Sequence, residues 1–447
     1  MDGMQETVYK KECTSEIEAS LGHTRKWNAK EAGIEVAKTA LKNLKSPPSF
    51  FIVFSTIHYK HYGGFQNFLD GIWEVLPENT PLIGGTVAGF INNKGSFTRG
   101  ASALAISYPN IDVALGIGKF TKLSPKKAAM YCSNMIKKSL NNSNYRNKFL
   151  INIISGPTVP FGKINVIKSK KLGKIAAHLG YKMFSFIGAG VGKEDEIIDT
   201  LIKELNDYYF IGGSTLDSGR MFHNFQFIDK EIHTNSIVAL GCSTDLSIFL
   251  NSMIGLHKTE KTFKISKTIS NKRIITKING KPAKDEFLKN LGIVEKQFVE
   301  LGPFYYRTSN YFPISFEENS KYTSGVAGFL GDYIALGYKA RGNNARIMSI
   351  TGEEIINIIN NSFRNFDENK TPFVFIPCSF ILPNTLGSKV NIIRETLEKF
   401  IDHKPYLIVL TVNENAGSPD NPACARVYSF NPFSLCKKNL NINDKYV

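Results

Sequence analysis

Apolar residues along the chain follow two spacings, one typical of buried strands and one typical of amphipathic helices. Residues 50–55 form a short apolar run after a pair of prolines, which predicts a buried strand. Apolar residues at three- and four-residue steps over 65–76 predict a helix that ends before a proline. Residues 81–86 predict a second strand, closed by Gly-Gly-Thr, and 101–107 predict a third. This segment therefore forms a strand-helix-strand unit.

The same order recurs twice further along the chain, and the second copy repeats the Gly-Gly-Ser/Thr ending. Its helix begins with three acidic residues, which are favourable at a helix N-terminus. The apolar run 149–154 is an alternative opening strand for this copy, and the pattern does not decide between it and 184–187. The second copy comprises 184–187, 197–205, 209–214 and a following strand over 236–241, and the third comprises 373–376, 392–400 and 406–410.

Three such units predict an α/β fold with mixed sheets, partly parallel and joined by crossover helices. A chain of 447 residues is too long for one ordinary core, so its length predicts two or three domains. Between the second and third units, residues 260–350 become Gly-rich with alternating apolar positions, which are typical of strands. We therefore predict an N-terminal extension over 1–35, one domain over 36–257 and a second over 258–447.

Composition indicates a globular protein with little disorder, because 42% of residues are hydrophobic and 21% are charged. The formal net charge is +16, but the basic residues are scattered and form no stripe, so we expect no nucleic-acid partner. The six cysteines are far apart, which argues against a zinc ribbon or a disulfide framework. There is no signal-peptide pattern and no apolar run of membrane-spanning length. We expect a cytoplasmic protein with no membrane partner.

Two motifs that resemble cofactor or metal sites fail in detail. The glycine loop 187–193 lacks the Gly that a nucleotide-binding loop needs at its first position, where Ile187 stands, and the Ser or Thr that should occupy the position of Glu194. It is interpreted as a turn between a strand and a helix. His58 and His61 have no nearby acidic or cysteine partner. We expect neither a cofactor nor a metal.

The two Gly-Gly strand ends are the first candidates for a binding site. In open α/β sheets ligands bind beyond the carboxyl ends of the strands, and glycine lets the backbone approach another group closely. The alternative is tight packing that needs small residues, and the pattern favours neither. The candidate residues here are Gly85, Thr86, Gly213, Ser214 and Asp217.

Cys378 also follows an apolar strand. A nucleophilic thiol needs a base and an electropositive setting, and no histidine lies near it in the sequence. A thiol that packs or lines a pocket is the favoured interpretation, with a catalytic one as the alternative.

One segment resembles a known family specifically. Residues 278–292 run from a strand through Asn-Gly and Pro-Ala into a helix that ends at Leu-Gly, which resembles the start of the C-terminal FIST domain. The resemblance, to the family expanded as F-box and intracellular signal transduction, covers about residues 35–436. An N-terminal FIST domain followed by a C-terminal one is expected. Further landmarks are 81–89, 210–214, Tyr306-Arg307, Arg341-Gly342 and 346–348.

The resemblance implies a sensory module that binds small ligands such as amino acids. It implies further site residues at Asn413 and Glu414, where Asn replaces a family Gly at a position that tolerates left-handed backbone. Arg307 and Arg341 are candidates for a ligand carboxylate, with structural ion pairs as the favoured alternative. The family often continues its cysteine as Cys-x-x-Arg, but this chain has Ile381 at the Arg position.

We therefore expect a cytoplasmic sensor that binds a small molecule and signals through a separate protein, and not an enzyme. The first alternative is an adaptor or scaffold that binds protein through the FIST body. A cysteine-dependent enzyme built on Cys378 is the second.

Overall fold

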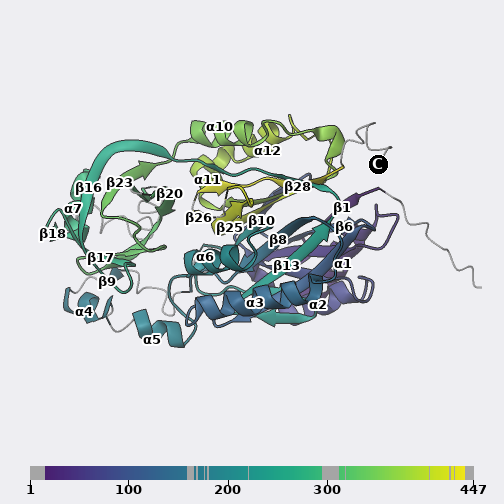
Figure 1. The fold of residues 1–447 in the computed structure, drawn as a ribbon, viewed down its shortest axis with the longest axis horizontal. Coiled ribbons are helices and arrows are strands. Elements are labelled where there is room, and N and C mark those ends of the chain that lie inside the picture. The colour runs from purple at the N-terminus through teal and green to yellow at the C-terminus, as the bar shows by residue number, and fades with distance from the viewer. Residues whose placement is uncertain are drawn as a thin grey trace, which may run out of the picture.

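The computed structural model describes residues 16–158, 166–167, 170–175, 177–178, 181–219, 221–293, 312–317, 319–401, 403–421, 424–426 and 428–437. Within these ranges the chain is a mixed α/β protein whose strands form three sheets (Figure 1). Helices cover the outer faces of the first two sheets, and the third sheet lies at one end of the molecule. The predicted fold class is confirmed.

The first sheet contains the first predicted unit. Its strand order is β1-β6-β2-β3-β11-β12, and β2 and β3 are parallel. The predicted strands and helix of this unit are confirmed, and α1 and α2 cover one face of the sheet. The elements are β1 (Glu18–Thr24), α1 (Ala29–Leu41), β2 (Phe50–Thr56), α2 (Phe65–Trp73), β3 (Leu82–Val87), β6 (Ala101–Ser107), β11 (Gln226–Ile228) and β12 (Glu231–His233).

The second sheet joins the second and third units. Its main path is β14-β28-β24-β25-β10-β8-β13-β7, with β8–β10 and β24–β25 parallel and β10–β25 antiparallel. The strands are β7 (Ile111–Lys119), β8 (Asn147–Ile154), β10 (Tyr208–Ser214), β13 (Ser236–Thr244), β14 (Ser247–Leu250), β24 (Val374–Ser379), β25 (Tyr406–Gly417) and β28 (Phe433–Cys436). The covering helices are α3 (Pro125–Leu140), α6 (Glu194–Glu204), α10 (Gly352–Ser362), α11 (Ile381–Leu386) and α12 (Asn391–Leu397).

The predicted opening strand over 184–187 is wrong, and the alternative over 149–154 is right. Residues 184–186 belong to the helix α5 (Tyr181–Phe186), whereas β8 pairs with both β10 and β13 and so fills the place beside β10. A run of four apolar residues does not distinguish a strand from a helical turn, which is why the pattern was misleading. The loop 187–193 therefore joins two helices.

A shared apolar core holds the first two sheets together. Phe50, Ile52 and Phe54 of β2 face the same cluster as Phe149 and Ile151 of β8. Strands of the third unit add side chains to this cluster. All three units therefore bury one sheet face in common, and their helices lie outside.

The third sheet has its own core around Phe263, Phe287 and Phe329. The predicted Asn-Gly turn is confirmed, because Asn279 and Gly280 have φ values of 50° and 79°. Its elements are β9 (Val166–Ile167), β16 (His257–Ile269), β17 (Ile274–Ile278), β18 (Lys281–Pro282), α7 (Ala283–Asn290), β19 (Ile314–Phe316), β20 (Asn319–Ser324), β21 (Val326–Leu330), β22 (Tyr333–Leu336) and β23 (Asn344–Ser349).

The predicted domain boundary at residue 257 coincides with the start of β16. The second sheet, however, takes strands from both sides of it, since β14 pairs with β28. The division into 36–257 and 258–447 stays a prediction. In the part of the chain that the structure describes, no helix is both long and apolar enough to cross a membrane.

Gly212 in β10 makes it possible for the strands of the second and third units to join in one sheet. It pairs with Asn152 of β8 on one side and Asn415 of β25 on the other. The two asparagine amides exchange hydrogen bonds, each 2.9 Å long, and both residues are fully buried. A Cβ at Gly212 would lie 2.0 Å from the Asn152 carbonyl oxygen and 2.7 Å from its Oδ1. The missing side chain therefore admits the asparagine pair.

We predict that Gly212→Ala lowers the free energy of unfolding by about 3 kcal/mol or more, because the added carbon must displace a backbone carbonyl. Urea denaturation followed by circular dichroism measures this. Gly352→Ala at the start of α10 is the control and should stay within about 1 kcal/mol of the natural protein. A Gly212→Ala protein as stable as the control would contradict the role of this glycine.

Candidate functional site

A small cavity lies where the three parts of the molecule meet. Its volume is about 60 Å³, and its walls are mainly apolar. Segments around the second unit, the third sheet and the third unit all contribute to it. The lining residues are Pro157, Val191, Gly192, Met221, Gly325, Val326, Ala327, Gly337, Ser379, Phe380, Ile381, Val412, Asn413 and Tyr428.

Two strands of the third unit shape one wall. β24 ends at Ser379, and β25 bends at Asn413, whose φ is 59°. The pairing of β25 with β10 shifts register at the same point, between Gly212 and Ser214. The left-handed backbone expected at Asn413 is thus confirmed. This bend places Asn413 on the cavity wall.

Glu194, the first residue of α6, lies directly behind the cavity wall and is fully buried. Ser214 Oγ donates a hydrogen bond of 2.9 Å to Glu194 Oε1, while Oε2 has no hydrogen-bond partner among the described residues. A Cβ on Gly192 would lie 2.0 Å from Oε1 and 2.2 Å from Oε2. The carboxyl therefore rests on the glycine that lines the cavity. Burial raises its pKa, and hydrogen bonds, among them the one from Ser214, offset part of this rise.

Lys122 is a second buried ionisable group close by. Its side chain is 1% exposed, and Nζ donates a 2.7 Å hydrogen bond to Thr158 Oγ1, next to the lining residue Pro157. Burial lowers the pKa of Lys122 to about 7, against the attraction of Glu194. Burial therefore favours the uncharged form of both groups.

Glu414 follows Asn413 and points into the sheet. It is fully buried, and its carboxylate accepts hydrogen bonds of 3.3 Å from Thr411 Oγ1 and 3.4 Å from Ser429 N and Oγ. Burial raises the pKa of Glu414 to about 8. Cys378 is fully buried in the core under α10 and α12, and burial, with a smaller contribution from Glu414, raises the pKa of its thiol.

The other predicted residues of the first two units lie in packed surroundings. Thr86 Oγ1 accepts a hydrogen bond from Phe225 N at 3.0 Å, and a Cβ on Gly85 would lie 2.6 Å from Thr215. Asp217 accepts hydrogen bonds from the backbone amides of Met221 and Phe222 at 2.7 and 2.8 Å. A Cβ on Gly213 would lie 2.6 Å from Thr411 Oγ1. Of the sequence-predicted site residues, Asn413 lines the cavity, and Ser214 reaches it through Glu194.

Of the two arginines predicted to bind a ligand carboxylate, Arg341 lies within the described residues. Arg341 pairs with Asp199 at 2.7 Å and stacks on the ring of Tyr322, with its guanidinium carbon 3.7 Å from the ring centroid. Arg307 lies outside the described residues. Ile381, at the position of the family arginine, lines the cavity and makes that wall apolar. The ligand roles of these residues stay predictions.

Sequence reasoning missed Lys122, Glu194 and Arg273, which are buried charged residues close to the cavity. Glu194 was visible as part of an acidic helix start, but nothing in the pattern separated it from Asp195 and Glu196. Lys122 follows a strand in a polar segment and carries no motif. Among the residues that the structure describes, no cluster of three or more His, Cys, Asp or Glu is suited to a metal ion.

The shifted pKa of Glu414 predicts how stability changes with pH. Because its carboxyl has a pKa of about 8 when folded and 4.5 in an unperturbed state, its contribution is present below about pH 4.5 and lost as the pH rises toward 8. The lowered pKa of Lys122 has the opposite effect above about pH 7, because the folded protein then holds this amine uncharged and stability rises with pH. We predict that Glu414→Gln flattens the loss of unfolding free energy between about pH 4.5 and pH 7, measured by urea denaturation. The exposed Glu395→Gln is the control, and equal slopes for the two variants would contradict the assignment.

The comparisons with known proteins address the family. No curated protein matches this sequence. The crystal structure of a cyanuric acid hydrolase from A. caulinodans aligns with 95% of this chain and 100% of its own, at 6% identity and a TM-score of 0.36. At that TM-score the likeness implies neither a shared fold nor a shared activity.

A family model described as the FIST N domain matches residues 49–281, more than half of the chain. The C-terminal FIST domain is not part of this match and stays a prediction, and the F-box expansion of the name is wrong and is dropped. FIST domains are small-ligand sensors in signalling. The chain belongs to the FIST family.

Proposed function

We propose that this protein senses a small polar molecule, such as an amino acid, that binds in the cavity beside Gly192 and Asn413. The observation that carries the proposal is the Glu194 carboxyl, which is fully buried at the cavity wall with one oxygen lacking a partner among the described residues. Buried polar atoms are normally paired, so an unpaired one beside a cavity suits a ligand that brings a donor.

The cavity favours a ligand with one polar end and a compact apolar part. Ile381, Val412 and Val326 supply apolar walls, while Asn413 supplies polar atoms on one side and Glu194 lies directly behind the wall at Gly192. A cavity of about 60 Å³ has room for only a few water molecules, so the ligand must be small or must widen the cavity. An ammonium group would stabilise the ionised form of Glu194, whose pKa burial raises.

Binding is a better-supported role than catalysis. The candidate nucleophile Cys378 is fully buried, and the raised pKa of its thiol disfavours the reactive thiolate. The nearest groups to its sulfur are in the apolar core and in the backbone, with Ser379 O at 3.6 Å. We propose that the signal passes to a separate protein by a change in conformation.

An adaptor role is the second candidate, and exposed apolar side chains favour it. Tyr131 of α3 and Phe186 of α5 are 67% and 74% exposed. Exposed apolar surface of this kind often marks a contact with another protein. This surface is equally suited to the output partner of a sensor, so the two roles are compatible.

Thermal-shift measurements with single L-amino acids and the corresponding amines test the sensor proposal. A ligand of the folded state should raise the melting temperature of the natural protein. We predict that Ala327→Leu, which fills the cavity, abolishes this rise without lowering the melting temperature of the free protein.

Ala335→Leu is the matched control, since Ala335 is half-buried on β22 and is not among the lining residues. It should keep the ligand-induced rise. If both variants keep it, the ligand binds elsewhere, and if no compound raises the melting temperature, the adaptor role is favoured.

A further inference from the structure

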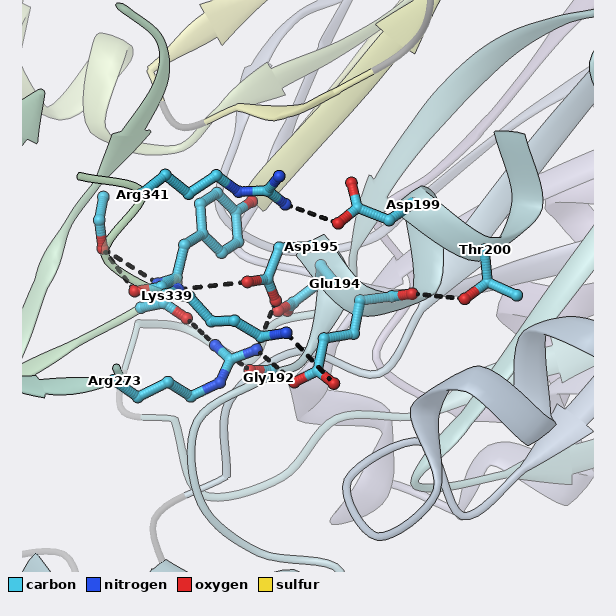
Figure 2. A network of polar contacts seen from close by, with 12 residues as sticks. Gly192, Glu194, Asp195, Asp199, Thr200, Arg273, Lys339 and Arg341 are labelled. Atoms are coloured by element: carbon cyan, nitrogen blue, oxygen red, sulfur yellow. Dashed lines mark hydrogen bonds and ion pairs between the residues drawn. The ribbon is translucent and has the colours of Figure 1, made fainter. Parts of the chain in front are cut away.

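The first turn of α6 faces two ways. Glu194 accepts a hydrogen bond from Ser214 behind the cavity wall, whereas Asp195 and Glu196 face the third sheet. Asp199, one turn later, also faces the third sheet, and Figure 2 shows these ion pairs. The acidic residues of α6 thus link the wall of the cavity to the third sheet, which packs against this helix. The helix dipole accommodates negative charge here, but the buried partners determine where each carboxylate lies.

Arg273, at the start of β17, is the central partner of this turn. Its side chain is 1% exposed, and Nη2 contacts Asp195 Oδ1 at 2.5 Å and Glu196 Oε1 at 3.0 Å. Nη1 donates to the carbonyl oxygens of Gly337 at 2.9 Å and Gly192 at 3.5 Å. The guanidinium of Arg273 therefore connects the loop before α6, at Gly192, with the third sheet, at Gly337.

Both glycines that Arg273 holds line the cavity. Gly192 belongs to the wall supplied by the second unit, and Gly337 follows β22 in the third sheet. The planar guanidinium with its fixed fork of donors fixes the distance between two acceptors better than a flexible ammonium does. The separation of the two walls therefore depends on where Arg273 docks.

We propose that Arg273 is the positioning residue of the cavity, and that docking of the third sheet onto α6 opens and closes it. A ligand that touches both walls stabilises the docked arrangement, because it interacts with that arrangement more strongly than with the undocked one. The ligand step rests on the proposed function, whereas the positioning of the two walls by Arg273 does not.

The other ion pairs of this interface contribute less to the geometry of the cavity. Arg341 and Asp199 are 24% and 38% exposed, so solvent screens their attraction. Lys339 Nζ lies 3.4 Å from Glu196, and its backbone amide donates to Asp195 Oδ2 at 3.2 Å. Arg273 is fully buried, unlike Arg341 and Lys339, and removing it leaves the carboxylates of Asp195 and Glu196 without a buried cation.

Hydrogen exchange of the ligand-free protein tests the positioning role with Arg273→Lys. Lysine keeps the charge but cannot reach the carboxylates and both carbonyls together. We expect amides over 188–193 and 325–338 to exchange about tenfold faster, which corresponds to ~1.4 kcal/mol of local opening free energy. Amides of β2 and β3 should be unchanged. Arg341→Ala is the matched control, because Arg341 lies at the same interface and its guanidinium pairs with Asp199.

Two results would overturn the proposal. Arg273→Lys and Arg341→Ala could speed exchange equally, or the Arg273 variant could leave both walls as protected as in the natural protein. If Arg273→Lys does not fold, Asp195→Asn, which keeps the arginine and its Glu196 partner, should open the same two segments to a smaller extent. Exchange confined to the neighbourhood of residue 195 would then count against the idea.

A separate experiment tests whether the ligand stabilises the docked arrangement. With the L-amino acid that gives the largest thermal shift, the natural protein should gain protection over 188–199 and 325–338, and Arg273→Lys should bind it about tenfold more weakly. Protection of one wall alone would overturn the coupling. Without any binding compound the proposed function fails, while the ligand-free experiment still decides the role of Arg273.

Discussion

Close approach of three strands around Gly212 is the constraint on which the rest of the structure depends. β10 lies between β8 and β25, and the Asn152–Asn415 amide pair crosses it where Gly212 has no side chain. Gly213, the next residue, leaves room for Thr411. Because these two glycines let the strands meet, the second sheet runs without a break from the first half of the chain into the last.

The cavity follows from that junction. Between Gly212 and Ser214 the pairing of β10 with β25 shifts register, Asn413 takes up left-handed backbone, and pairing resumes at Ser214 and Val412. The cavity lies beside this irregular stretch and is closed by the Gly192 loop and by the third sheet. Glu194 and Lys122 are buried at this point, and burial disfavours their charged forms, which is costly for folding unless a bound molecule or a neighbour compensates. Ionisable groups with shifted pKa values gather at functional sites, so the cavity and the two buried charges both support a binding site here.

Most of the fold could be predicted from the sequence, because apolar spacing identified the strands and helices of the three units. The exception, 184–187, had too few residues to separate a strand from a helical turn. The candidate site was predicted less well. Asn413 lines the cavity because its type suits left-handed backbone, which is a local property. The importance of Glu194 and Arg273 depends on burial between distant segments, and no local pattern reports that. The Gly-Gly endings correctly indicated that other atoms come close to the backbone there, but these atoms belong to neighbouring strands and side chains and not to the cavity.

A crystal structure of the protein grown with the amino acid or amine that raises its melting temperature most tests the central claim directly. The account predicts ligand density between Gly192, Gly337 and Asn413, with a polar group of the ligand within hydrogen-bonding distance of Glu194. Ligand density only elsewhere, for example in the polar cleft between Asn93 and Arg394, with the cavity unchanged, would contradict it.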